Sequence, residues 1–327
     1  MANTTIATNL VQKAWAKATW EAGIHKSYFD KFTGTGADSI VQVKTELQKG
    51  AGDNIVIPLL MPLSGAGVTG DNTLEGNEEA LIYRDFNVSI DQLRNAVRIA
   101  GKMEEQKTQI NMRTDAKNAL SDWLATTIDK KIFTVLSTNP SKDRTVYAGS
   151  ATSASSLSAS DIFNVDIIGK AKRLATADEN TMVKPIKIDG RDVYVMVIDQ
   201  FQARDLMNDQ KWLDAQHYAQ SRGNDNPIFT GALGMYDGVV IHQHTRVIRN
   251  TSGSTPYSSG LFLGAQAAVM AVGNNPEWNE DTFDYGNQVG FEFGRIFGIA
   301  KSAFDYKGNG TKTDFGVVNV ITATPDD

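Results

Sequence analysis

Two histidines, His242 and His244, stand two positions apart in a run that begins at Val239 and is rich in β-branched residues. Such a run predicts a strand, and side chains two positions apart on a strand share one face. Imidazole nitrogens are common zinc ligands, so the pair has the spacing of a metal site. A third ligand is not apparent, because His25 and His217 lie in unrelated contexts. We therefore interpret the two histidines as ordinary strand residues.

The segment from Gly65 to Gly70 matches the pattern G-x-G-x-x-G. That pattern binds phosphate only where a strand precedes it and a helix begins directly after it, so that backbone N–H groups point at the ligand. Here Pro58 and Pro62 precede the glycines, and a polar run from Asp71 follows them. The pattern is typical of a loop at the tip of a hairpin.

Carboxylates stand in adjacent pairs at Glu78-Glu79 and Glu104-Glu105, but a pair alone does not place two carboxyl groups about a substrate. The chain has no Cys, no G-x-S-x-G elbow, no P-loop and no H-E-x-x-H pattern. We therefore predict no catalytic residue, cofactor or metal, and a protein that is not an enzyme. One alternative stays open, a cytoplasmic enzyme with an αβ domain at 184–250 that uses His242 or His244.

The composition narrows the function classes. The 327 residues carry a formal net charge of -6, which argues against a basic face that grips nucleic acid. The N-terminal sequence lacks the features of a signal peptide, and no run of apolar residues is long enough to span a membrane. We expect a protein made in a cytoplasm, with no membrane partner, that gains stability from packing and from assembly.

The longest predicted element is a helix over 103–136, uninterrupted by Gly or Pro. Its second half carries apolar residues at i, i+4 spacing, which predicts one buried stripe: Ala116, Leu120, Leu124, Ile128, Ile132 and Leu136. The stripe is too short for a coiled coil. The pattern therefore favours a helix that lies as a spine along a domain.

A projecting hairpin is predicted before this helix. The run 54–63 is rich in β-formers but carries two prolines, which suits an edge strand. A second run, 81–90, alternates in polarity. The polar segment between them is a long tip, and tips of this length usually serve function or contact.

The remaining segments predict an aromatic arm and a mixture of helices and strands. In the arm, an amphipathic helix and the aromatic residues after it have no core of their own, so they must dock on their own domain or on a neighbour. Beyond the long helix, the sequence predicts these elements: a helix over 161–175 capped by Ser160, a strand over 193–198, a helix from Asp199, a strand followed by a short helix over 261–272, an alternating span over 283–304 and a strand over 314–323.

The order of these parts resembles the HK97 fold of tailed-phage major capsid proteins. Six segments of the sequence are similar to a podophage-type capsid family. With the first residue of each numbered, they are Pro58-Leu-Leu-Met-Pro-Leu-Ser-Gly-Ala-Gly-Val-Thr-Gly-Asp, Leu74-Glu-Gly-Asn-Glu-Glu, Phe86-Asn-Val-Ser-Ile, Thr230-Gly-Ala-Leu-Gly-Met-Tyr-Asp-Gly-Val, Phe283-Asp-Tyr-Gly-Asn and Phe315-Gly-Val-Val-Asn-Val. The resemblance implies an α+β fold with five parts: an N-terminal arm (1–41), an extended loop (42–100), a peripheral domain with the spine and second helices (101–183), an inserted axial domain (184–259) and a return to a β-rich core (260–327).

The resemblance also implies a function, that of a major capsid protein. Such a chain would form hexamers and pentamers of an icosahedral virion shell that encloses double-stranded DNA without sequence-specific binding. It would assemble in the bacterial cytoplasm with a separate scaffolding protein, because no segment for scaffolding precedes the arm, and with a portal and decoration proteins. An encapsulin-like cellular compartment is the alternative with the same fold. The intersubunit contacts implied are Trp15, Trp20, Tyr28, Phe29, Leu63, Val68, Leu74, Glu78, Glu79, Trp212 and Tyr218.

Overall fold

The computed structural model divides into two compact units. It describes residues 8–49, 52–63, 65–107, 111–178, 181–188, 190–217, 232–251 and 255–326. The first unit comprises Met1–Ile55, Val88–Val135 and Ala268–Ala300, and the second comprises Val56–Asn87, Leu136–Ala267 and Lys301–Asp327. None of the described helices is long and apolar enough to span a membrane.

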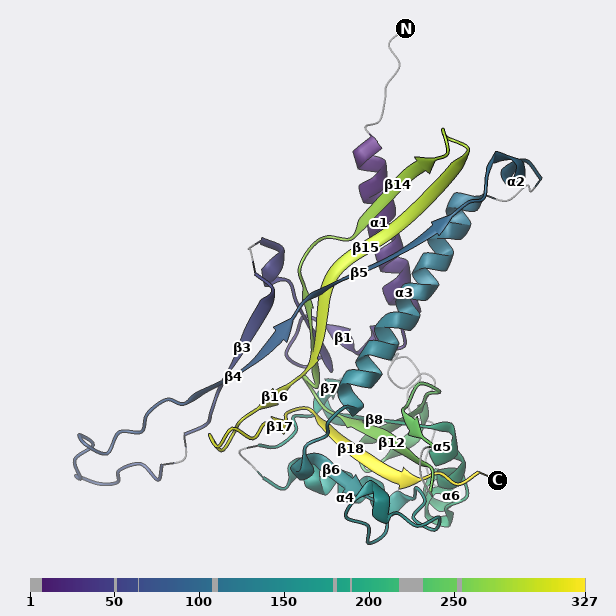
Figure 1. The fold of residues 1–327 in the computed structure, drawn as a ribbon. Coiled ribbons are helices and arrows are strands. Elements are labelled where there is room, and N and C mark those ends of the chain that lie inside the picture. Colours follow the sequence, from purple (N-terminus) through teal and green to yellow (C-terminus); the bar gives the residue numbers. More distant parts are fainter. Residues whose placement is uncertain are drawn as a thin grey trace. The chain divides into compact units, whose positions relative to one another are not determined.

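The first unit is built on the helix α3 (Met112–Ser137) (Figure 1). All six residues of the predicted stripe, from Ala116 to Leu136, are buried. Each Leu or Ile in such a stripe contributes roughly 2 kcal/mol by leaving water. The predicted run is not one helix, however, because the structure has a separate short helix, α2 (Lys102–Lys107), before α3. The polar sequence before Ala116 offers no continuous apolar face that packing could stabilise.

Helix α1 (Thr8–Lys26) packs beside α3, so the aromatic arm docks on its own unit (Figure 1). At Gly23 the backbone of α1 lies against the Leu124 side chain, and an added Cβ would lie 2.7 Å from Leu124 Cδ2. The Ser121 hydroxyl donates to the carbonyl of Thr19 at 3.3 Å. Beyond Lys26, a 3-10 turn (Asp30–Phe32) brings two buried phenylalanines against the unit.

A sheet of order β1-β2-β13-β15-β14 completes the first unit, and β5 pairs with β15. The strands are β1 (Thr33–Gly34), β2 (Val41–Lys44), β5 (Asp91–Arg98), β13 (Ala268–Val272), β14 (Glu277–Phe283) and β15 (Gln288–Lys301). The short helix predicted near 268–272 is wrong. All five residues of β13 are buried in the sheet, and this burial on both faces overrides the helical tendency of the alanines.

The second unit contains a sheet of order β6-β18-β12-β8-β10-β9, with β11 beside β12 and β7 beside β8. The strands are β6 (Thr145–Tyr147), β7 (Ile186–Ile188), β8 (Arg191–Ile198), β9 (Ala232–Tyr236), β10 (Val239–Gln243), β11 (Arg249–Asn250), β12 (Tyr257–Leu263) and β18 (Val317–Ala323). The apolar run of β8 is buried throughout from Val193 to Ile198, as its sequence predicts.

Helices α4 (Val165–Thr176), α5 (Gln200–Met207) and α6 (Gln210–His217) belong to the same unit. Helix α4 begins four residues later than predicted, because Asn164 and not Ser160 caps it and accepts a hydrogen bond from the Ile167 N–H. Helix α5 starts after Asp199, as predicted.

Two domain boundaries implied by the resemblance fall inside continuous structure. Helix α4 shares a core with strand β8, where Ile168 and Met196 are both fully buried, so the boundary at 183 separates elements that pack together. The boundary at 259 lies within β12. The names peripheral and axial stay predictions.

Candidate functional site

The first candidate surface is the hairpin of β3 (Asn54–Leu60) and β4 (Tyr83–Ser89) (Figure 1). These two strands form a sheet of their own, which confirms the extended pair and the edge position of Pro58. The pair is shorter than the predicted loop over 42–100, since the chain after Ser89 enters β5 and joins β15. Strand β4 buries Phe86 and Val88 and exposes the alternate residues Asp85, Asn87 and Ser89.

The hairpin exposes large apolar side chains. The following are between 47% and 62% exposed: Val56, Leu60, Leu63, Leu74, Leu81, Ile82 and Tyr83. Single exposed apolar residues are common on protein surfaces, but a gathering on one element marks an interaction surface. Val68, predicted with this group, is partly exposed.

Hydrogen bonds within the tip give it a defined shape. The Gly65 N–H donates to Glu79 Oε2 at 2.7 Å, and the Gly76 N–H donates to Glu78 Oε2 at the same distance. The Asn77 N–H donates to the Leu74 carbonyl at 2.9 Å. No helix or strand follows Gly70 before β4, so the G-x-G-x-x-G match lacks the context of a phosphate site. The side chains of Glu78 and Glu79 therefore hold the backbone of the tip in place.

The predicted contact residues of the arm lie largely inside the first unit. Phe29 is fully buried, with its ring centroid 5.0 Å from that of Phe133. Trp20 packs edge-on against Phe297 at 5.9 Å, and Tyr28 contacts the Phe29 ring at 5.2 Å. The side chain of Trp15 lies outside the described residues. This packing gives the aromatic arm an intramolecular role that sequence alone left open.

The last two predicted contact residues belong to the segment around α6. Trp212 is only 4% exposed and belongs to the core of the second unit, so it presents almost no surface to a neighbour. Tyr218 lies outside the described residues.

His242 and His244 lie in and just after strand β10. His242 is buried on β10, and His244 Nδ1 accepts a hydrogen bond of 3.1 Å from the Arg246 N–H. Across the described ranges, no three His, Asp or Glu side chains gather in a way that could hold a metal ion. Glu104 and Glu105 lie on α2, and their side chains are outside the described residues.

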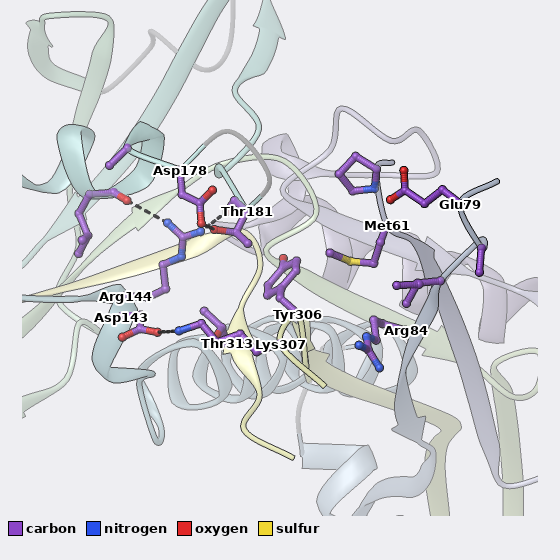
Figure 2. A pocket seen from close by; sticks show the side chains of 15 residues that line it. Met61, Glu79, Arg84, Asp143, Arg144, Asp178, Thr181, Tyr306, Lys307 and Thr313 are labelled. Carbon is purple, nitrogen blue, oxygen red and sulfur yellow. Dashed lines mark hydrogen bonds and ion pairs between the residues drawn. The ribbon is translucent and has the colours of Figure 1, made fainter. Parts of the chain in front are cut away.

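A second candidate surface is a pocket of about 430 Å³ within the second unit, where strands β3 and β4 pass into the tip of the hairpin. Figure 2 shows Tyr306 between the side of the pocket that carries Arg144 and the side that carries Met61, Glu79 and Arg84. Sequence reasoning missed this pocket, because its residues come from three distant segments. One signal was present: Arg84 occupies a position on β4 in phase with the buried Phe86 and Val88, where a charge is unexpected.

The electrostatics of the pocket follow from burial. Arg144 donates from Nη1 to the Leu174 carbonyl at 3.0 Å and from Nη2 to the Thr181 carbonyl. Burial lowers the pKa of Arg144, and nearby groups, Tyr306 and Asp178 first among them, oppose that shift. Burial raises the pKa of Tyr306 well above its usual range, and the Arg144 charge opposes that shift in part. Tyr306 is therefore a neutral hydrogen-bond donor at physiological pH.

Neither surface holds a pair of groups arranged for acid–base or nucleophilic chemistry, and both are suited to contact. Comparison with known proteins agrees. The family described as phage capsid protein matches residues 3–326. The major capsid protein of Pseudomonas phage KPP25 is 31% identical to this chain over 97% of its length and 96% of the relative. The chain belongs to the phage capsid protein family.

Solved capsids show the same fold for this capsid protein. A chain from the capsid of Ralstonia phage GP4 is 32% identical, with a TM-score of 0.81 over 92% of both chains. A chain from the cyanophage Pam1 capsid is 25% identical, with a TM-score of 0.78 over 100% of both chains. A capsid chain of Helicobacter pylori bacteriophage KHP30, 19% identical with a TM-score of 0.73, shares the fold.

These matches confirm the α+β, HK97-like fold and the identification as a major capsid protein of a tailed phage, which forms part of the virion capsid. The chain is thus a structural protein that assembles into a multimeric shell. The alternatives of an encapsulin-like compartment and of an αβ enzyme are not favoured.

Proposed function

We propose that the capsid protein forms hexamers and pentamers of an icosahedral shell, and that the β3–β4 hairpin carries the main contact between neighbouring subunits. The observation that supports this most directly is the gathering of exposed Leu, Ile, Val and Tyr side chains on that hairpin. An isolated two-stranded ribbon is marginally stable in water, so it gains most from packing on another surface. Burial of such side chains in a neighbour contributes roughly 2 kcal/mol each.

The proposed contact residues are Leu63, Val68 and Leu74 at the tip, with Glu78 and Glu79 holding the tip backbone in shape. Trp15, Trp20, Tyr28 and Tyr218 stay predictions. Phe29 and Trp212 are not carried forward, because their burial within their own units leaves almost no surface for a neighbour.

We propose double-stranded DNA and three kinds of phage protein as the partners of the shell. The formal net charge of -6 suits a shell that contains double-stranded DNA without gripping it. A separate scaffolding protein, a portal and decoration proteins complete the proposed set. We propose no enzymatic activity for the chain.

The test is deletion of residues 65–79, followed by electron microscopy and sedimentation velocity. The wild-type chain is expected to form shells or capsomers, and the deletion variant is expected to stay unassembled while it keeps its circular dichroism spectrum. A wild-type chain that stays monomeric under all conditions contradicts the proposal. Unfolding of the deletion variant contradicts the role of the tip.

A more specific test of the same contact replaces Leu63 and Leu74 by Ser. Both side chains are exposed in the free chain, so the folded subunit loses little stability while the contact loses two apolar anchors. The matched control is Leu213→Ser, which removes an exposed leucine of α6 outside the hairpin. Assembly should fall for the double variant and not for the control.

A further inference from the structure

Arg84 is a charged residue at the start of β4, where the strand leaves the tip of the hairpin. Its side chain is half-buried and lines the pocket of Figure 2, and its buried Nε has no hydrogen-bond partner among the described residues. Its charge acts on Asp305, but that carboxylate already accepts hydrogen bonds from the N–H groups of Asn309 and Gly310. A buried donor without an acceptor costs about 1–3 kcal/mol, so an acceptor for Arg84 is expected in the functional state.

A second buried donor without a partner lies in the same pocket. The hydroxyl of Tyr306 has no hydrogen-bond partner among the described residues. The other charged side chains of the pocket already have partners. Lys307 Nζ lies 3.5 Å from Asp143, and Arg144 donates to two backbone carbonyls. Glu79 accepts from the Gly65 N–H, and Asp178 accepts from the Thr181 hydroxyl. The pocket therefore offers Arg84 and Tyr306 to a group that brings acceptor oxygens.

The pocket continues into a groove with apolar walls. A neighbouring pocket of about 340 Å³ shares Met61, Pro62, Thr181 and Tyr306 with the first. Together the two pockets follow the hairpin where its strands meet the tip. Their walls include these apolar residues: Leu59, Leu60, Ala80, Ile82, Leu174, Ala177, Met182 and Phe315. An occupant that fits this groove carries a carboxylate next to an aliphatic side chain.

The hairpin tip has that chemistry. Between residues 64 and 83 the chain holds four acidic residues and no Lys or Arg. Glu78 and Glu79 bind tip backbone, whereas Asp71 and Glu75 are exposed and have no ion pair with any described residue. Leu74, one of the most exposed apolar residues, directly precedes Glu75. The tip cannot readily fold back into the groove of its own chain. The Met61 N–H donates to the Ile82 carbonyl and continues the strand pairing beyond Arg84, and the Gly65 N–H is held by the Glu79 side chain across the tip.

We infer that this groove receives Leu74 and Glu75 of a second copy of the chain, with the Glu75 carboxylate bound by Arg84. The inference rests on the proposed contact through the hairpin and adds the receiving surface and the charge pair that sets its register. A matched pair of opposite charges favours the correct neighbour and penalises others.

The experiment is a charge exchange across the contact. Arg84→Glu and Glu75→Arg are each expected to lower the yield of shells at least about tenfold, because each places like charges together. The chain that carries both substitutions is expected to recover assembly, since each subunit then presents the reversed pair to its neighbour. Shells are counted by negative-stain microscopy and quantified by sedimentation velocity.

Two control variants separate assembly from folding. Arg84→Met keeps the length of the side chain and removes its charge, so it should lower assembly without lowering the melting temperature. Arg191→Glu reverses an exposed charge of the same unit outside the groove, and it should leave assembly unchanged.

The outcomes distinguish the two levels of the proposal. If the wild-type chain assembles but Arg84→Glu assembles equally well, or if the double variant stays as impaired as Arg84→Glu, the groove is not the receptor and the inference fails. Wild-type assembly that depends on added inorganic phosphate, lost in Arg84→Met, indicates a small anion at Arg84 and also overturns it. A wild-type chain that forms neither shells nor capsomers under any condition overturns the proposed function itself.

Discussion

Asp129 of α3 accepts a hydrogen bond of 2.6 Å from the Ser27 hydroxyl, just beyond the end of α1. The same carboxylate accepts from the N–H groups of Tyr28 at 3.0 Å and Phe29 at 3.4 Å. One buried side chain thus holds three donors of the segment that follows α1. This arrangement fixes where the aromatic arm turns back on the first unit, and it makes the arm part of the folded subunit.

Asp129→Ala is expected to destabilise the first unit by about 3 kcal/mol, because it leaves buried donors without an acceptor. Asp129→Asn keeps one acceptor oxygen and should lose less. Urea denaturation of the unassembled subunit, followed by tryptophan fluorescence, measures both losses. Asp122→Ala is the matched control on the same helix. Asp122 pairs with Lys26 at 2.7 Å on the surface, where such a pair contributes about 1 kcal/mol or less. Equal losses for the two Ala variants would contradict the role given to Asp129.

The same contact predicts a dependence of stability on alkaline pH. Burial, and then the nearby charge of Asp129, raise the pKa of Tyr28 far above its ordinary value of 10.0. Between the ordinary pKa and the raised pKa, the folded state keeps the hydroxyl proton of Tyr28, which the unfolded chain releases. The contribution of Tyr28 to stability is therefore complete below about pH 10 and declines as the pH rises further. Denaturation at pH 9 and pH 11 should show a larger loss for the wild type than for Tyr28→Phe.

The comparison with Tyr28→Phe is needed because another group acts in the opposite direction. Burial lowers the pKa of Arg295 to about 10, and its guanidinium lies over the Trp20 ring at 3.6 Å. A lowered pKa makes the folded state release its proton before the unfolded chain does, so this group adds stability as the pH rises. Subtracting the pH dependence of the Tyr28→Phe variant from that of the wild type cancels the contribution of Arg295. An identical pH dependence in both would refute the assignment to Tyr28.

Gly298 lies where β15 meets the chain before β5, and it has no room for a side chain. A Cβ at this position would lie 1.9 Å from the carbonyl oxygen of Ser89, which is a backbone atom that cannot rotate away. Gly298→Ala is therefore expected to destabilise the first unit by about 3 kcal/mol or more. On the same strand, a Cβ at Gly294 would meet the flexible side chains of Arg94, at 3.1 Å, and Glu292, at 3.7 Å. Gly294→Ala should change the free energy of unfolding by about 1 kcal/mol or less, and thermal unfolding of both variants tests the contrast.

The sequence predicts an element well where the pattern that specifies it lies within one segment of the chain. The stripe of α3 and the buried run of β8 follow from periodicity within one segment, and both are confirmed. Strand β13 and the Asn164 cap were missed, because the neighbours that bury β13 and the hydrogen bond that favours Asn164 over Ser160 are fixed by the folded chain. The groove was missed for the same reason, since Arg84, Arg144 and Tyr306 are far apart in the sequence. Only the charge of Arg84 in phase with apolar positions of β4 gave a local sign of it.

The last prediction concerns a buried ion pair in the second unit, where Lys301 Nζ lies 2.9 Å from Asp314 Oδ1. Lys301 also donates to the carbonyls of Thr138 and Asn139, just beyond the end of α3, and Asp314 Oδ2 accepts from the Ser141 N–H at 3.0 Å. The two side chains are 11% and 2% exposed, so each charge depends on the other.

Lys301→Met leaves the Asp314 charge buried and unpaired, and it should destabilise the second unit by about 3–5 kcal/mol. Adding Asp314→Asn removes that charge while it keeps an acceptor for Ser141, so the double variant should be more stable than Lys301→Met alone. Lys307→Met is the control. Its partner Asp143 lies 3.5 Å away with both side chains exposed, and the loss should stay below about 1 kcal/mol. Additive losses in the cycle of Lys301 and Asp314 variants would show that the two charges act independently, against the geometry described here.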